Sequence, residues 1–126
     1  MGLSAYLVLS DELTNEIFCE FCTKNNGVFI AESDSYSFSE EKGNVWVSVL
    51  GDEEPVSGEE IEQYSRLLCA PPRTQILFEV GWESKSEAMY LELALKMMTA
   101  WNGILCDLNE NFLTKADVEI RLKAIG

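Results

Sequence analysis

The stretch from Thr74 to Asp107 constrains the fold of this chain more than any other part, because it predicts a strand, a long helix and a second strand in direct succession. Apolar side chains occupy every second position from Ile76 to Trp82, which is the period of a strand with one buried face. Ile104, Leu105 and Cys106 predict a short buried strand after the helix. We expect these three elements to form the centre of the core.

The helix between the two strands is predicted to be buried over most of its circumference. From Ala88 to Trp101 the polar residues are Glu92, Lys96 and Thr99, and together with Lys85 they form one narrow stripe. We therefore expect this helix to be the most buried helix of the protein.

Helix boundaries are predicted from capping signals. Residues 84 to 87 (Ser-Lys-Ser-Glu) and residues 57 to 60 (Ser-Gly-Glu-Glu) both fit a capping box, in which a hydroxyl and a carboxylate satisfy two free amides. Ser10 and Thr114 are candidate N-caps of the first and last helices. Asn102-Gly103 is expected to end the central helix, because glycine tolerates the left-handed conformation after a last turn.

The chain of 126 residues is expected to form a single domain, residues 1–126. The predicted order is strand, helix, strand, strand, helix, strand, helix, strand and helix. A turn at residues 41–44 predicts a hairpin that leads into a strand from Val45 to Leu50. These elements predict an α+β fold, in which a mainly antiparallel sheet carries helices packed on one face, as a broadly ferredoxin-like two-layer sandwich.

The charge of the chain limits its partners. The sequence has 22 acidic residues, 9 basic residues and no histidine, which gives a formal net charge of −13. Such a chain repels nucleic acid and anionic membranes and attracts basic proteins. The sequence has no apolar run of membrane-spanning length, and its first residues lack the basic region of a secretory signal. We therefore expect a cytoplasmic protein without direct nucleic-acid or membrane binding.

The missing histidine also removes the Ser-His-Asp and Cys-His catalytic arrangements. The chain has neither a glycine-rich phosphate loop nor a Gly-x-Ser-x-Gly elbow. A pair of carboxylates remains available for hydrolysis, but a glycosidase normally needs a larger cleft than a chain of this size builds. We expect a protein that is not an enzyme and has no cofactor and no metal site.

Cys19, Cys22, Cys69 and Cys106 are expected to be free structural thiols in a reducing compartment. Cys19 and Cys22 form a C-x-x-C motif, but it lies inside the predicted helix and not at its start, where the helix dipole would stabilise a thiolate. Two thiols without a histidine also supply only half of a zinc site.

Acidic residues are concentrated in one quarter of the chain. Ten acids but only one base, Lys42, lie between positions 32 and 62. A calcium loop is disfavoured, because Asp52-Glu53-Glu54 lacks the alternating ligand order of such loops. Two interpretations stand: a solvated surface that maintains solubility, or a docking face for a basic partner. The concentration favours the docking face, since solubility does not require clustering.

Trp46 lies in the predicted strand from Val45 to Leu50, within the acidic quarter of the chain. If Val45 and its alternate neighbours face the helices, Trp46 points to the other face of the sheet, together with Leu77 and Glu79. Either a further element covers that face, or the face is open and has the composition of a protein-binding surface. The candidate partner-binding residues are Glu32, Asp34, Glu40, Glu41, Trp46, Asp52, Glu53, Glu54, Glu59, Glu60, Glu62 and Glu79.

Residues 78–82 (Phe-Glu-Val-Gly-Trp), the helix from Ser86 to Trp101 and the strand from Asn102 to Asp107 resemble the closing strand-helix-strand of bacterial immunity proteins. These proteins are cognate inhibitors of contact-dependent or secreted polymorphic toxins. The resemblance covers about a quarter of the chain and rests on its pattern, so it assigns no site residue. It implies a cytoplasmic protein that binds one toxin domain, often a basic nuclease, and blocks the active site or substrate surface of that domain.

The alternative is an acidic mimic of nucleic acid, such as an anti-restriction inhibitor. Mimics spread carboxylates over most of a surface, whereas the second half of this chain is nearly neutral. A regulatory domain that binds a small molecule is a third class, but the sequence offers no basic cluster that would hold a phosphate or a carboxylate.

Overall fold

The computed structural model describes residues 3–50 and 58–125 of the chain. Its strands pair into one open antiparallel sheet in the order β2-β3-β4-β5-β1-β6-β7, which confirms the predicted α+β class and the antiparallel sheet. In chain order the elements are β1 (Leu3–Leu9), α1 (Asn15–Lys24), β2 (Val28–Ile30), β3 (Ser35–Glu40), β4 (Gly43–Leu50), α2 (Gly58–Leu68), β5 (Thr74–Val80), α3 (Ser86–Ala100), β6 (Gly103–Cys106), β7 (Phe112–Leu113) and α4 (Lys115–Ile125).

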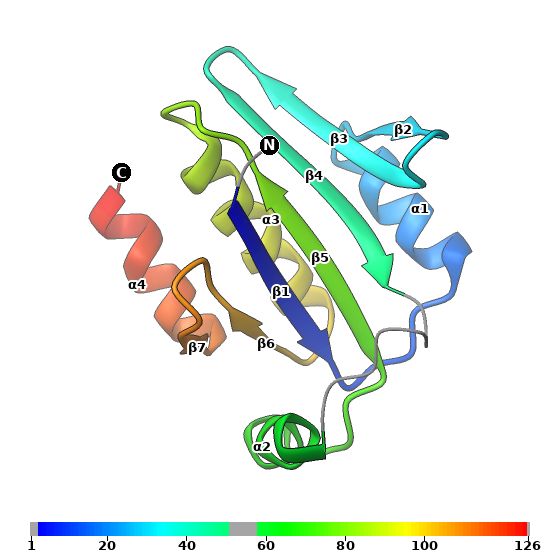
Figure 1. Ribbon diagram of the computed structural model, residues 1–126, viewed down its shortest axis with the longest axis vertical. Coiled ribbons are helices and arrows are strands. Elements are labelled where there is room, and N and C mark those ends of the chain that lie inside the picture. Colours follow the sequence, from blue (N-terminus) through cyan, green and yellow to red (C-terminus); the bar gives the residue numbers. More distant parts are fainter. Residues whose placement is uncertain (1–2, 51–57, 126) are drawn as a thin grey trace.

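Three helices pack against one side of this sheet, which we call the inner face (Figure 1). Helix α3 lies along β4, β5 and β6, α4 lies beside α3, and the ring of Phe21 on α1 contacts Trp101 after α3. Helix α2 is the exception to the prediction of helices on one face. It packs on the opposite side, the outer face, at one end of the sheet, where Tyr64 and Leu68 contact Val8 and Ile104.

Helix α3 is the most buried of the described helices, as the narrow polar stripe predicted. Its buried residues include Tyr90, Leu91 and Met97, each at most 1% exposed, while the four stripe positions 85, 92, 96 and 99 are exposed. The ring of Tyr90 packs on Phe78 of β5 at 5.9 Å between centroids. Burial of this helix face therefore supplies a large part of the apolar area that stabilises the fold.

The predicted capping box at residues 84 to 87 is wrong. Helix α3 begins at Ser86, and the preceding Lys85 makes no side-chain cap. The Ser86 hydroxyl instead accepts a hydrogen bond from the Asn44 amide at 3.0 Å, which ties the start of α3 to β4. The prediction that the strand extends to Trp82 is also wrong: β5 ends at Val80, and Trp82 is 72% exposed.

Two further boundary predictions differ from the structure. Helix α1 begins at Asn15 with Thr14 as its N-cap. Ser10 lies before the helix, where its backbone N–H donates a hydrogen bond to the Asn102 carbonyl oxygen. Gly103 opens β6 and does not take a left-handed conformation. Its lack of a side chain serves packing, since a Cβ there would lie 2.6 Å from the Leu9 side chain.

The remaining boundary signals have mixed outcomes. Thr114 caps α4 as predicted, and its hydroxyl accepts from the Asp117 amide at 3.3 Å. The turn between β3 and β4 is also confirmed. The proposed cap at Ser57 lies outside the described residues.

Candidate functional site: the outer face of the sheet

The alternation of the strands places a second set of side chains on the outer face, away from α3. In β4 and β5, buried core residues alternate with the half-buried Trp46, Ser48, Leu77 and Glu79. Trp46 lies directly opposite Glu79 in the pairing of the two strands, and Ser48 lies opposite Leu77. Trp46, Leu77 and Glu79 therefore share one face, as the alternation predicted.

Two rows of side chains continue across the neighbouring strands. The first row consists of Ser37, Trp46, Glu79 and Ser4, and the second consists of Ser48, Leu77, Tyr6 and Cys106. We call these eight residues the outer-face patch. Within the described part of the chain, the helix that packs on this side of the sheet is α2, and it covers the region beyond the second row. The patch is thus a half-exposed sheet surface with two aromatic rings, one leucine and one carboxylate.

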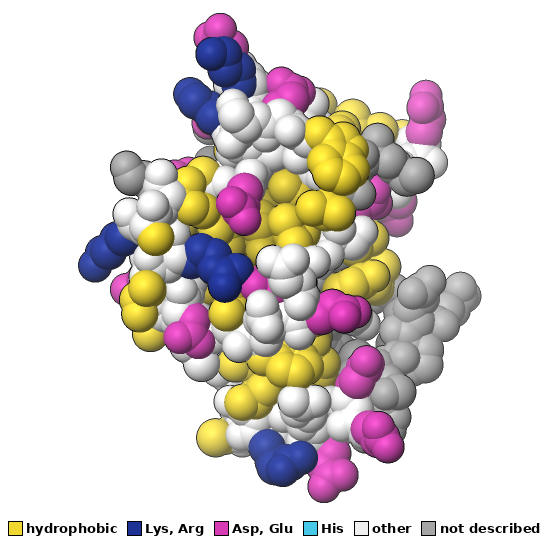
Figure 2. Space-filling view, turned by 60° about the vertical axis from the view of Figure 1, so that its left-hand side comes forward, with side chains coloured by type: hydrophobic (Ala, Val, Ile, Leu, Met, Phe, Trp, Pro, Cys, Tyr) yellow, Lys and Arg dark blue, Asp and Glu magenta, His cyan; other side chains and the backbone are white. Residues whose placement is uncertain are grey.

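Negative charge predominates around this patch. The described strands contain no Lys or Arg, and the acids within them are Glu40 and Glu79. Figure 2, which brings the left-hand side of Figure 1 forward, shows exposed hydrophobic side chains in the middle of that view, with both basic and acidic side chains beside them, and a group of acidic side chains at its lower right. A sheet surface whose described strands carry acids and no bases favours a partner of positive charge.

Beside the outer-face patch, α2 and the turn between β6 and β7 enclose a hollow of ≈ 640 Å³. Its lining from the sheet includes Tyr6, Gln75 and Cys106. Glu60 on α2 and Glu110 on the turn also line it. Helix α2 is held in place by its buried aromatic side chain, since the ring of Tyr64 meets Phe112 of β7 edge-on at 5.3 Å. The hollow is therefore built from packed elements on two sides.

Asp107 fixes the turn that forms one wall of this hollow. Its Oδ1 accepts hydrogen bonds from the amides of Asn109 and Asn111 at 2.9 and 2.8 Å, and its Oδ2 accepts from Arg121 Nη1 of α4 at 2.6 Å. Burial alone would raise the pKa of this carboxyl, but the two amides and the Arg121 guanidinium outweigh burial and lower its pKa. Asp107 is therefore a structural anion that is already neutralised, and it is not a free base.

The acids singled out in the sequence fall in separate places. Glu32 and Asp34 lie in the turn before β3, and Glu40 and Glu41 lie at its other end, so about 20 Å of strand separates the two pairs. A third group, Glu59, Glu60 and Glu62, is exposed on α2. Asp52, Glu53 and Glu54 lie outside the described residues. Among the predicted residues, the structure brings together Trp46 and Glu79 on the patch and places Glu60 at its border.

Some residues of this site were not singled out from the sequence. Tyr6 was predictable in principle, because it alternates with the core residue Leu7 in the first strand. Gln75 had the same signal one position before Ile76. Glu110 had none, because the short strand β7 that creates its turn has only two residues and no recognisable period.

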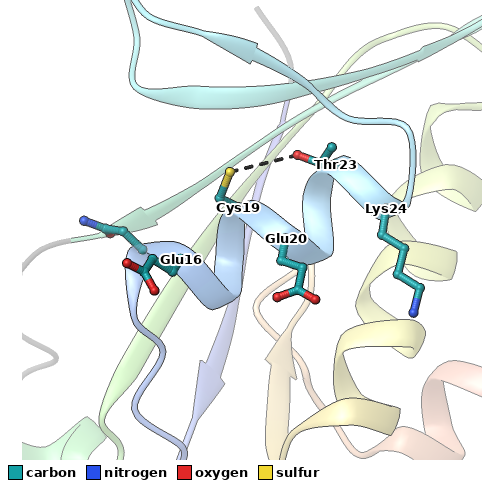
Figure 3. Close-up of a pocket in the computed structure, with 6 residues that line it drawn as sticks. Glu16, Cys19, Glu20, Thr23 and Lys24 are labelled. Atoms are coloured by element: carbon teal, nitrogen blue, oxygen red, sulfur yellow. Dashed lines mark hydrogen bonds between the residues drawn. The ribbon is translucent and has the colours of Figure 1, made fainter.

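The C-x-x-C motif lies on α1, at a shallow depression along that helix of ≈ 790 Å³ (Figure 3). Cys19 and Thr23 point to one side of the helix, and their Sγ and Oγ1 atoms lie 4.0 Å apart. Cys22 is fully buried instead, and burial, with a smaller contribution from Cys19, raises the pKa of its thiol to about 12. A thiol with that pKa is a poor nucleophile, so the motif lacks the activated thiolate of a redox pair.

Other classes of site were sought in residues 3–50 and 58–125. No group of three or more His, Cys, Asp or Glu side chains there is arranged to hold a metal ion. None of the helices in these ranges has the length and apolar character that crossing a membrane requires. Comparisons with protein-family models, with curated proteins and with solved structures found no match to this chain.

Proposed function

We propose that this chain is an immunity protein: a cytoplasmic inhibitor that binds a cognate bacterial toxin domain and neutralises it. The observation that supports this proposal most is the outer-face patch, a sheet surface that no described helix covers over Trp46, Leu77 and Glu79. A soluble domain gains nothing in stability from leaving such side chains half exposed, whereas a partner that covers them gains apolar area.

The composition of the patch suits a protein partner. Tryptophan and tyrosine are the side chains that most often dominate the energy of protein interfaces, and Trp46 and Tyr6 lie on adjacent rows of the patch. The surrounding polar side chains are mostly serines, which desolvate at little cost when they pair across an interface. A few aromatic anchors within a polar rim would give a specific complex of ordinary size.

The charge of the chain supports a basic toxin, such as a nuclease, as the partner. A net charge of −13 accelerates encounter with a basic domain and repels nucleic acid, so direct nucleic-acid binding is not part of this proposal. The resemblance to immunity proteins adds the class of partner. In this proposal the chain performs no chemistry, and it acts by covering the active site or substrate surface of the toxin.

A growth assay tests this function. The proposal implies a toxin domain encoded next to this chain, and that domain would be expressed in a sensitive bacterium, with and without the chain. Wild-type chain should restore growth, and Glu79→Lys should fail to do so, because a cation at the centre of the patch would face a basic partner. Glu119→Lys is the matched control: Glu119 is exposed on α4, so the same charge reversal should leave protection intact.

Loss of protection in both variants, or in neither, would reject the patch as the contact surface. If the wild-type chain fails to protect against the toxin but displaces DNA from a DNA-binding enzyme, the nucleic-acid mimic replaces the immunity protein as the function.

A further inference from the structure

We propose that the hollow between α2 and the β6–β7 turn receives an arginine side chain of the partner protein. This inference rests on the proposed function and specifies how the partner recognises this side of the sheet. The aromatic side chains of the outer-face patch supply the apolar contact, and the hollow beside them binds a cation. Tyr6 and Cys106 belong to the patch and also line the hollow, so one partner surface would reach both.

The shape of the hollow is the first argument. Its volume of ≈ 640 Å³ is within the range of sites that enclose small ligands, and a single long side chain occupies a fraction of it. The sheet supplies its floor, while α2 and the β6–β7 turn supply two walls of different origin. Both walls are anchored, one by the buried Tyr64 and the other by the buried Asp107. The hollow is therefore formed before a partner arrives, which lowers the entropic cost of binding.

The charge of the lining is the second argument. Glu60 and Glu110 come from the two walls, and no Lys or Arg is among the described residues that line the hollow. Burial is the main cause that raises the pKa of the Cys106 thiol. A hydrogen bond with Tyr64 opposes this rise, and the carboxylates of Asp107, Glu110 and Glu60 add smaller contributions that raise the pKa. The carboxylates of Glu110 and Glu60 thus act on this thiol, while the charge of Asp107 is already compensated by Arg121. An incoming cation would lower this accumulated negative potential, and an anion would increase it.

The chemistry of the lining favours arginine among the possible cations. The half-buried phenol ring of Tyr6 offers aromatic surface, on which a planar guanidinium stacks better than an ammonium. The carboxylates and the side-chain amides of Gln75 and Asn109 offer acceptors spread around the hollow, and a guanidinium has five donors to satisfy them. A metal ion is disfavoured, because the described acids and thiols do not form a group of three suited to a metal.

The test titrates the isolated full-length chain with a small probe and follows backbone amide signals by NMR. The probe is N-acetyl-arginine N-methylamide, and the matched neutral control is its citrulline counterpart, which has nearly the same shape without the charge. The arginine probe should shift the amides of Tyr6, Gln75, Cys106 and Asn109, with a dissociation constant on the order of 1 mM. The citrulline probe should shift none of them, and the lysine counterpart should bind several-fold more weakly.

Variants of the walls sharpen the assignment. Glu60→Gln and Glu110→Gln should each weaken arginine binding by about threefold, as expected for the loss of a partly exposed charge pair. Glu119→Gln, an exposed acid of α4, is the control and should bind the probe as the wild-type chain does. All three positions are exposed, and unchanged melting temperatures would show that each variant remains folded.

Equal shifts with the citrulline probe, a stronger response to the lysine probe, or shifts confined to other elements would overturn the inference. The outcome is separable from that of the growth assay. A hollow that binds arginine in a chain that fails to protect against the toxin would reject the immunity function alone. If the chain protects against the toxin but its hollow does not bind the arginine probe, only this inference would be rejected.

Discussion

Asp107 illustrates how a buried charge is made stable in this protein. The carboxylate is 2% exposed, yet its two oxygens accept hydrogen bonds from two backbone amides and one guanidinium. These donors stabilise the charged form more than burial destabilises it, so the pKa of the carboxyl is lowered. Asp107 therefore joins the β6–β7 turn to α4, and the position of one wall of the hollow depends on it.

Substitution of Asp107 by Asn should destabilise the protein by about 1.5–3 kcal/mol at neutral pH. The charged hydrogen bonds are lost, and the side-chain NH2 of Asn would lie against a hydrogen-bond donor in place of a carboxylate oxygen. Since the pKa is lowered on folding, the stabilisation is complete above the ordinary pKa of about 3.9 and is lost as the pH falls through the lower pKa of the folded state. Urea unfolding at pH 7 and at pH 3 measures this. An equal difference between wild type and variant at both pH values would contradict the assignment.

The four cysteines differ in exposure, and this difference gives a second prediction at the residue scale. Cys19 and Cys69 are exposed, Cys106 is half-buried, and Cys22 is fully buried with its thiol pKa raised to about 12. A thiol reagent at pH 8 should therefore modify Cys19 and Cys69 quickly and Cys22 only after unfolding, since the thiolate is the reactive form. The denatured chain should titrate four thiols without prior reduction. Fast modification of Cys22 in the native protein would show that α1 is packed differently.

Among the elements, α3 is the one on which the fold depends most. Leu91 is fully buried on its inner side, so Leu91→Ala should lower the free energy of unfolding by about 2–5 kcal/mol through lost apolar contact and a residual cavity. Glu92→Ala, at the next position but exposed, is the control and should change stability by less than about 0.5 kcal/mol. Thermal or urea unfolding measures both. If Leu91→Ala were as stable as the wild-type protein, the placement of α3 in the core would be contradicted.

Comparison of the elements shows what sequence patterns could and could not predict. The alternation in β4 and β5 and the stripe on α3 predicted burial correctly, because such periods report which side of an element faces the core. The caps at Ser10 and Ser84 failed because those residues form tertiary hydrogen bonds or lie outside the helix, and local signals carry no information about distant partners. The side on which α2 packs was equally unpredictable, since it depends on contacts with β1 and β6.

The candidate site was predictable to a similar extent. Alternation alone brought Trp46, Leu77 and Glu79 to one face. The hollow beside them was not predictable, because it requires the fold to bring Glu60 of α2 near Glu110, fifty positions away in the chain. The acids of positions 32 to 41 are close in sequence but lie at opposite ends of β3. An extended strand separates them in space, although few positions separate them in the sequence.

At the scale of the whole molecule, the fold has two unlike sides. Among the described helices, α1, α3 and α4 cover the inner face, and α2 packs on one end of the outer face (Figure 1). The rest of the outer face that the structure describes carries half-buried aromatic side chains in a molecule with net charge −13. The central claim is that a basic protein partner binds there, with Trp46 as its main anchor.

Association and dissociation kinetics of two tryptophan variants test this claim most directly, with the toxin domain that the proposal implies as partner. Trp46→Ala should raise the dissociation rate by about 30-fold, equivalent to about 2 kcal/mol, while leaving the association rate nearly unchanged. Trp82→Ala removes the same side chain from an exposed position beyond the end of β5, and should change neither rate by more than about twofold. Rates that respond to Trp82→Ala and not to Trp46→Ala would contradict the assignment of the outer face as the binding surface.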